Sequence, residues 1–231
     1  MKLSIVIPVY NEKKTIIQII DAVNHVDLSD IEKEIIVVDD FSTDGTREVL
    51  AGLSGIEVCL HQKNMGKGSA VKTGFSRASG EIVVIQDADM EYDPNDYKKL
   101  LVPILRGQAD VVYGSRFIGG DPKRVLYIWH MFGNRFLTIL SNILTGLTLT
   151  DMETCYKMFR KEAIDSFYKK LQSKRFGIEP EITARIAQGK WRVYEVGIAY
   201  YGRTYTEGKK INWRDGVLAI WQIIKFNLLN K

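Results

Sequence analysis

Cysteine, proline, excess charge and long apolar runs are all scarce in this sequence of 231 residues. The two cysteines, Cys59 and Cys155, lack metal-ligand spacing, and free thiols in a reducing compartment are their simplest interpretation. No stretch reaches the roughly 18 consecutive apolar residues that span a bilayer. Lysine and arginine total 32 against 28 acidic residues, and the net charge of +4 is too small to indicate nucleic-acid binding. We therefore expect a globular cytoplasmic protein that touches a membrane at most peripherally.

Segments with the patterns of strands and helices alternate through the first half of the chain. Apolar runs predict strands at 3–9, 34–38, 56–60, 81–85 and 109–113, and helical periodicity predicts helices at 13–23, 67–78 and 95–105. This alternation favours an α/β fold with a mostly parallel, Rossmann-like sheet and helices on both faces. Beyond residue 117 we expect strands at 155–159 and 191–198, helices at 163–171, 179–188 and 213–229, and a long apolar segment at 126–149. No Pro/Gly-rich linker divides the chain.

Polar or special residues follow four of the predicted strands. They are Pro8, Asp39-Asp40, Asp87-Ala88-Asp89 and Gly114-Ser115-Arg116. Ligands of such sheets bind at the carboxyl ends of the strands. Two carboxylates one residue apart suit a divalent cation, since Mg²⁺ takes one or two carboxylates together with substrate phosphates. A solvated turn would explain a single Asp-x-Asp, but four such sequences at one sheet edge predict a binding site.

The order and spacing of four short motifs along the chain are also informative. Residues 8–12 (PVYNE), 37–46 (VVDDFSTDGT), 64–70 (NMGKGSA) and 87–89 (DAD) resemble those of the family 2 glycosyltransferases, which have the GT-A fold. With residues 114–116 (GSR), 150–157 (TDMETCYK), Arg203 and Lys209, the chain is similar to the dolichyl- or polyprenyl-phosphate mannose and glucose synthases. The resemblance covers the whole chain and implies a single domain, 1–231. Residues 1–116 would bind the nucleotide sugar, and residues 117–231 would bind the acceptor and end in an amphipathic interfacial helix.

The resemblance assigns residues to the donor and to a metal ion, Mg²⁺ or Mn²⁺. Asp89 would be the principal metal ligand, with Asp87 and Glu91 beside it. Arg203 and Lys209 would close over the donor diphosphate and neutralise the leaving group. A solvated loop is the alternative interpretation of these two cations, and turn formation is the alternative for Asp39 and Asp44. The remaining predicted donor contacts are Pro8, Tyr10, Glu12, Val38, Asp40 and Ala88.

On the acceptor side, the resemblance implies that Arg116 binds the acceptor phosphate, assisted by Arg135 or His130. A guanidinium binds phosphate bidentately. A lipid phosphate is already an anion and needs no general base, which favours direct, inverting displacement with Asp89, Arg116 and Arg203 as catalytic residues. A hydroxyl acceptor would instead need a carboxylate base. The candidates for that base are Asp151, Glu179 and Glu181, although the last two have an alternative role as acidic residues at a helix N-terminus.

The leading hypothesis is transfer of a hexose, mannose from GDP-mannose or glucose from UDP-glucose, to a polyprenyl phosphate. A saccharide acceptor in cell-surface polysaccharide synthesis and a non-catalytic nucleotide-sugar-binding module are the alternatives. An apolar stripe on 213–229 predicts docking at the cytoplasmic face of a membrane, alone or through a membrane-anchoring partner protein, and 126–149 would help to admit the lipid. Core packing is the alternative for both segments. The glycines of 64–68 are interpreted as packing residues and not as a site.

Overall fold

A seven-stranded sheet organises the computed structural model, which describes residues 1–125, 128–204 and 213–230, without the side chains of His130, Trp213 and Arg214. The strand order is β3-β2-β1-β4-β6-β5-β7. Its strands are β1 (Lys2–Val9), β2 (Glu32–Asp39), β3 (Glu57–Leu60), β4 (Ile82–Ile85), β5 (Val111–Ser115), β6 (Lys157–Arg160) and β7 (Val193–Gly197).

The sheet is mostly parallel, as predicted. Strand β1 pairs in parallel with β2 and β4, and β5 pairs in parallel with β7. Only β6 runs against its neighbours, and it lies between β4 and β5. Two antiparallel pairings in succession leave β5 running in the same direction as β4. The residues that follow β1, β2, β4 and β5 therefore meet at one edge of the sheet.

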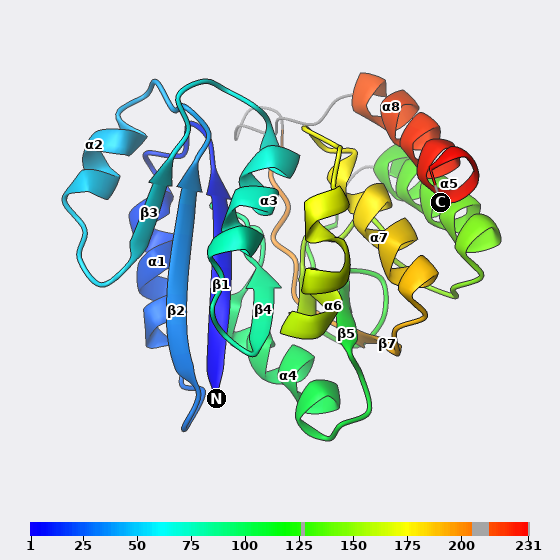
Figure 1. Ribbon diagram of the computed structural model, residues 1–231, viewed down its shortest axis with the longest axis horizontal. Helices are drawn as coiled ribbons and strands as arrows, with labels where there is room; N and C mark the ends of the chain where they lie inside the picture. The colour runs from blue at the N-terminus through cyan, green and yellow to red at the C-terminus, as the bar shows by residue number, and fades with distance from the viewer. Residues whose placement is uncertain (126–127, 205–212, 231) are drawn as a thin grey trace.

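Helices cover both faces of the sheet (Figure 1). In that view α3 and α6 lie in front of the strands and α1 lies behind β2, while α5 and α8 lie side by side next to α7. The α-helices are α1 (Ile16–His25), α2 (Thr46–Ala51), α3 (Lys67–Arg77), α4 (Tyr97–Leu105), α5 (Ile128–Thr145), α6 (Lys161–Phe167), α7 (Ile178–Gly189) and α8 (Trp213–Ile224). Two 3₁₀ turns, η1 (Pro94–Asp96) and η2 (Tyr168–Lys170), and a π-helical segment, η4 (Lys225–Leu229), complete the described elements.

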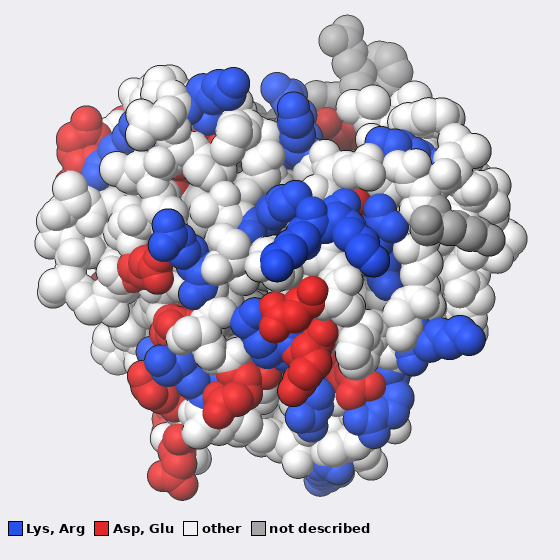
Figure 2. Space-filling view, in the orientation of Figure 1, with Lys and Arg blue, Asp and Glu red and all other residues white. Residues whose placement is uncertain are grey.

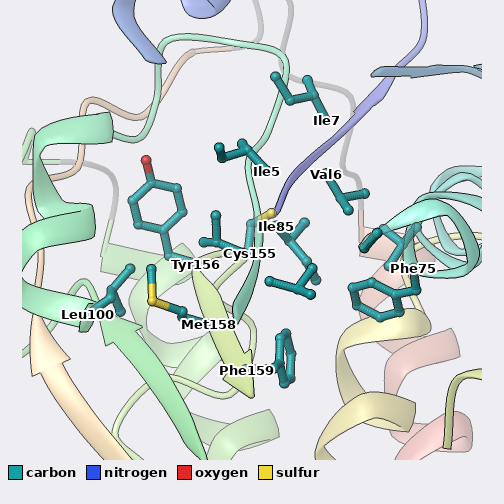
Figure 3. Packing of buried hydrophobic residues seen from close by; sticks show 14 of the residues in the cluster. Ile5, Val6, Ile7, Phe75, Ile85, Leu100, Cys155, Tyr156, Met158 and Phe159 are labelled. Carbon is teal, nitrogen blue, oxygen red and sulfur yellow. The ribbon is translucent and has the colours of Figure 1, made fainter. Parts of the chain in front are cut away.

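The core fills the space between the sheet and these helices. Figure 3 shows Val6 of β1 directed toward Phe75 of α3, and Ile5 on the side of Tyr156 and Leu100. All five side chains are fully buried. Alternation of this kind is what a strand covered on both faces requires. The packing of α3 is especially close, because a Cβ on Gly74 would lie 2.2 Å from Cγ1 of Val6.

The predicted elements are confirmed apart from small shifts at their ends. Strand β6 begins at Lys157 instead of residue 155, and the segment 126–149 contains the 18-residue helix α5. Within the described residues no helix is both long enough and apolar enough to cross a membrane. The glycines of 64–68 do serve packing, because a Cβ on Gly66 or Gly68 would lie 2.1 Å from a backbone oxygen of the 173–174 loop.

Candidate active site at the carboxyl ends of the strands

Three carboxylates from separate parts of the chain surround the side chain of Arg203. Glu12 follows β1, whereas Asp89 and Glu91 follow β4. The Arg203 guanidinium donates to Oδ2 of Asp89, and it lies 3.3 Å from Oε1 of Glu12 and 3.3 Å from Oε1 of Glu91. The backbone N–H of Arg203 also donates to Glu91 at 2.8 Å. The structure thus brings together four residues that the sequence assigned to the donor and the metal.

Asp87 faces a different cation. Its Oδ1 lies 2.7 Å from Nζ of Lys67, the first residue of α3. Lys67 also lies 3.5 Å from Glu179, and Glu179 in turn accepts from Nζ of the fully buried Lys157. Charges therefore alternate from the strand end to the start of α7. Sequence reasoning missed Lys67, although a lysine at a helix start beside the predicted sheet edge was a usable signal.

The two aspartates of the motif differ in their protonation because of these neighbours. Burial, together with repulsion from Asp87 and Glu91, raises the pKa of Asp89 to about 7, against the opposing effect of Arg203. Burial acts in the same direction on Asp87, but attraction to Lys67 outweighs it and holds the pKa of Asp87 below its usual value. Asp87 is therefore an anion at neutral pH even without a bound cation.

Asp40 and Asp39 are both buried and bonded within the protein. Asp40 accepts from the backbone N–H groups of Met65 and Gly66, at 2.8 and 2.6 Å, and from His61. Asp39 accepts from backbone N–H groups of the following turn and from Arg47, so its interpretation as a turn-forming residue is confirmed. Asp44 likewise accepts from Thr46 at the start of α2.

The remaining donor-side residues line the same edge of the sheet. Pro8 and Val38 are buried partners in the β1–β2 register, and Tyr10 is exposed beyond the end of β1. Ala88 is buried, and its carbonyl accepts from Thr15 at 3.0 Å. Their contacts with a nucleotide stay predictions, and Lys209 lies outside the described residues.

Arg116 follows β5 and is held by a buried carboxylate. Its Nε and Nη2 donate to Asp151 at 2.6 and 2.7 Å, and its backbone N–H donates at 3.1 Å. The guanidinium carbon lies 5.1 Å from the ring centroid of Tyr200, whose hydroxyl donates to Glu91 at 2.9 Å. Tyr200 therefore connects the predicted acceptor arginine to the carboxylate group around Arg203.

The two residues predicted to assist Arg116 lie on α5. Arg135 is exposed on this helix, and the side chain of His130 lies outside the described part of the structure. Asn134, from the same helix, donates to Asp151 at 3.2 Å. Helix α5 thus contacts the partner of Arg116, and the phosphate-binding roles of Arg135 and His130 stay predictions.

The three predicted candidates for a general base all form hydrogen bonds or ion pairs with other residues of the protein. Asp151 is paired with Arg116, and Glu179 is paired with two lysines. Glu181 accepts from the backbone N–H groups of Gln172 and Ser173, at 3.0 and 2.7 Å, which agrees with a structural role.

Glu153 is a buried carboxyl group that sequence reasoning missed. Its Oε1 has no hydrogen-bond partner among the described residues. Burial and the nearby Glu179 raise the pKa of Glu153 to about 7, against Lys157 and Arg116, which lower it. A carboxyl group with a pKa near neutrality suits proton transfer.

The carboxylates at the strand ends fit a divalent metal ion by their chemistry. Hard oxygen ligands are those that Mg²⁺ and Mn²⁺ prefer. Among the described residues, no three His, Cys, Asp or Glu side chains gather closely enough to hold a metal. Glu12, Asp89 and Glu91 instead converge on one cation, Arg203. Asp89 and Glu91, with Asp87 beside them, would hold the metal.

Known structures share this architecture. Glucosyl-3-phosphoglycerate synthase from Mycobacterium tuberculosis, solved with Mn²⁺, UDP and phosphoglyceric acid, superposes with a TM-score of 0.71 at 21% identity. The match covers 99% of this chain and 78% of that chain. The same enzyme has been solved with Mg²⁺ and UDP, also with a TM-score of 0.71. The strand order and the acidic site at the strand ends place the protein in the GT-A fold class.

The sequence comparison identifies the family. The profile described as "Glycosyl transferase family 2" matches residues 4–167, and the chain belongs to this family. An uncharacterised protein of Methanocaldococcus jannaschii is 28% identical over 227 residues, which cover 95% of this chain and 90% of that protein. The dolichol-phosphate mannosyltransferase of Pyrococcus furiosus is 37% identical over 123 residues, 52% of this chain and 34% of that longer protein. A UDP-N-acetylglucosamine–dolichyl-phosphate N-acetylglucosaminyltransferase of Methanococcus voltae is 24% identical, covering 97% of this chain and 95% of that enzyme.

Proposed function

We propose that the protein transfers a hexose from a nucleotide sugar to a polyprenyl phosphate, with inversion and with Mg²⁺ or Mn²⁺ as cofactor. The observation that carries the proposal is the joining of two sites. The carboxylates around Arg203 suit a metal-bound diphosphate, and Tyr200 connects them to Arg116, which suits an acceptor phosphate. Two of the relatives named above act on dolichyl phosphate. GDP-mannose and UDP-glucose are the proposed donors.

In the proposed reaction, Arg116, Arg203 and Asp151 have different roles. Arg116 binds and orients an acceptor that is already an anion, so the displacement needs no general base. Arg203 supplies positive charge where the leaving diphosphate develops its negative charge. A metal ion held by Asp89 and Glu91 would supply further neutralisation of the diphosphate. Asp151 holds Arg116 in place by a bidentate pair.

A second candidate function, transfer to a hydroxyl group, is favoured by the unpartnered buried Oε1 of Glu153. In that reaction Glu153 would act as the general base. General-base catalysis typically contributes about 10²–10⁴-fold to a rate. The Glu153→Gln variant would then lose most of its activity, whereas transfer to a lipid phosphate would leave it near the wild-type rate.

We expect label from GDP-mannose or UDP-glucose to move into organic-soluble lipid when the protein, Mn²⁺ and a polyprenyl phosphate are mixed. The same assay on Glu153→Gln is expected to give a rate within about threefold of wild type, because the acceptor phosphate is ionised without a base. Label that appears only in water-soluble saccharide, with its loss in Glu153→Gln, would establish the second candidate instead. If sugar is transferred to neither acceptor, the result would favour the remaining alternative, a non-catalytic nucleotide-sugar-binding module.

A lipid acceptor requires access to a membrane, and α5 and α8 offer an apolar surface. Helix α8 buries Ala219 and Ile223, and the following segment η4 buries Phe226. The exposed apolar side chains of the two helices and η4, here called the α5–α8 face, are Ile128, Trp129, Met131, Phe132, Phe136, Ile139, Ile143, Val217, Leu218, Trp221, Leu228 and Leu229. The predicted stripe on 213–229 thus points largely outward at Val217, Trp221 and Leu228. Exposed apolar side chains concentrated on helices that pack together are typical of protein or membrane contacts.

Charge near the α5–α8 face favours an anionic lipid surface. Helix α5 contains no acidic residue, and the exposed Lys123 and Arg124 precede it. In Figure 2, Lys and Arg gather across the middle of the face shown, beside a mostly uncharged region on the side of α5 and α8. Basic side chains beside an exposed apolar helix are typical of segments that lie in the interface of anionic membranes. We therefore propose peripheral docking at the cytoplasmic face.

The Trp129→Ser/Phe136→Ser double variant is expected to lose at least tenfold of its binding to vesicles that contain anionic lipid. Trp129 is 77% exposed and Phe136 is 57% exposed, so the change removes apolar surface without opening the core. Co-sedimentation measures the binding. Leu105→Ser, at the end of α4, serves as the control because Leu105 is also exposed (52%) but lies outside the α5–α8 face. Equal binding of all three proteins would contradict direct docking and favour an anchoring partner protein.

A further inference from the structure

The side chain of Arg203 occupies the place where the acidic groups of the site converge. It contacts Glu12, Asp89 and Glu91 at once, and its exposed fraction is only 21%. Each contact uses a carboxylate oxygen, the same kind of atom that a divalent cation would need. One guanidinium therefore neutralises part of the charge of three carboxylates.

Asp87 does not share in this arrangement, because its carboxylate is paired with Lys67 at 2.7 Å. The site therefore contains two separate cation–carboxylate groups side by side. A guanidinium keeps its charge at every accessible pH. Arg203 consequently stays a cation throughout, and a second cation brought to the same oxygens would be repelled by it.

The backbone of Arg203 is anchored independently of its side chain. Its N–H donates to Glu91 at 2.8 Å, and the N–H of Tyr201 donates to the carbonyl of Glu91 at 2.8 Å. The hydroxyl of Tyr200 donates to the Glu91 carboxylate as well. These bonds hold the segment 200–203 against the end of β4, so a rotation of the Arg203 side chain alone can remove its contacts with Asp89 and Glu12 and its Nε contact with the Glu91 carboxylate.

We propose that Arg203 is a built-in counter-ion that competes with a free divalent cation for Asp89 and Glu91 and yields to it only when a diphosphate is present. The diphosphate offers the guanidinium a new anionic partner, so the cation and the nucleotide bind together more readily than the cation binds alone. This inference rests on the proposed function, because it takes the same carboxylates as the metal ligands. It adds that Arg203 couples the binding of the cation to the binding of the nucleotide.

The competition predicts opposite effects of one substitution on two binding reactions. Arg203→Met removes the competing charge, so the variant is expected to bind Mn²⁺ alone about tenfold more tightly than wild type, within the usual 5–150-fold range of coupling between ligands. The same variant is expected to bind Mn²⁺ together with UDP or GDP less tightly than wild type. If Arg203 only binds the diphosphate, the substitution would weaken the binding of Mn²⁺ with nucleotide but would leave the affinity for Mn²⁺ alone unchanged. Electron paramagnetic resonance of free Mn²⁺ measures both, with no catalytic turnover.

Two further variants complete the experiment. Arg203→Lys keeps a positive charge and is expected to bind free Mn²⁺ nearly as weakly as wild type. Arg192→Met is the matched control, since Arg192 also pairs with a carboxylate, Asp110, but precedes β7 at the opposite edge of the sheet. It is expected to leave Mn²⁺ binding unchanged. Thermal unfolding verifies that each variant is folded.

The outcomes separate this inference from the proposed function. If wild type binds Mn²⁺ with a nucleotide but Arg203→Met gains no affinity for Mn²⁺ alone, the counter-ion role is wrong and the proposed function stands. If no variant binds Mn²⁺ with or without nucleotide, the metal-dependent function fails and the counter-ion role fails with it. Tighter Mn²⁺ binding by Arg203→Met, in a protein that transfers no sugar to lipid, would support the counter-ion role alone.

Discussion

Asp89→Asn is expected to lower the rate of sugar transfer by at least about 10²–10³-fold, the usual effect of removing one group that stabilises developing charge. Asparagine keeps the shape of the side chain but removes the negative charge that is proposed to bind a metal ion. A single-turnover assay with labelled donor and Mn²⁺ measures the loss. Asp165→Asn, a substitution of an exposed aspartate that pairs with Lys161 on α6, serves as the control and is expected to keep the wild-type rate.

The stability of Asp89→Asn distinguishes lost chemistry from lost folding. The pKa of Asp89 is about 7 in the folded protein, above its ordinary value of 3.8. A carboxyl group whose pKa is raised by folding favours the folded state below its unfolded pKa, and this contribution is lost as the pH rises through about 7. The variant is therefore expected to be at least as stable as wild type at pH 8. Full transfer activity in Asp89→Asn would exclude the metal-binding role, and with it the main argument for a metal-dependent transferase.

Arg116→Met is expected to cost about 3–5 kcal/mol in the free energy of unfolding, because it leaves Asp151 buried without its partner. Asp151 is fully buried, and although burial alone would raise its pKa, attraction to Arg116 holds that pKa below its usual value. Such a carboxylate stabilises the fold above its unfolded pKa, and this stability is lost as the pH falls. Chemical denaturation at pH 7 measures the difference between the variant and wild type.

The Arg116→Met/Asp151→Asn double variant separates the structural role of Arg116 from its role in binding. Removing both charges is expected to restore most of the stability, since replacing both partners of a buried pair costs far less than removing one. Transfer to the lipid phosphate is expected to stay at least tenfold below wild type, because the guanidinium proposed to bind the phosphate is still absent. A double variant that regains both stability and transfer would show that Arg116 acts only through the fold.

Local patterns in the sequence were sufficient to predict the sheet and the edge where its polar residues meet. The run of apolar residues in β1 and β4 and the carboxylates that follow β4 are features of neighbouring residues, and the structure confirms both. Pairings between distant residues were not visible in the same way. Two examples are the ion pair of Lys67 with Asp87 and the contacts of Arg203 with Glu12 and Asp89. These depend on which loops lie side by side in the folded protein.

Two further features escaped the sequence for a related reason. Glu153 lies within the motif 150–157, and nothing in the sequence distinguishes it from the other acidic residues there. Its burial in the folded protein shows that one of its carboxyl oxygens lacks a hydrogen-bond partner among the described residues. Helix α5 has polar residues such as Thr138 and Ser141 along one side, so ordinary periodicity would have placed its apolar side in the core and could not show which apolar residues face solvent. The structure shows that Trp129 and Phe132 do.

The position of β6 limits how this protein can be divided or recombined. A strand from the second half of the chain lies between β4 and β5 of the first half, so the two halves assigned from the sequence share one continuous sheet. Expressing residues 1–116 alone would leave β4 and β5 without the strand that joins them. Exchanging residues 117–231 between relatives would likewise require β6 of one protein to form its hydrogen bonds with β4 and β5 of the other. If α5 and the loops contact the acceptor as proposed, a new acceptor preference is therefore more readily engineered, or evolved, by substitutions in these segments than by exchange of half the chain.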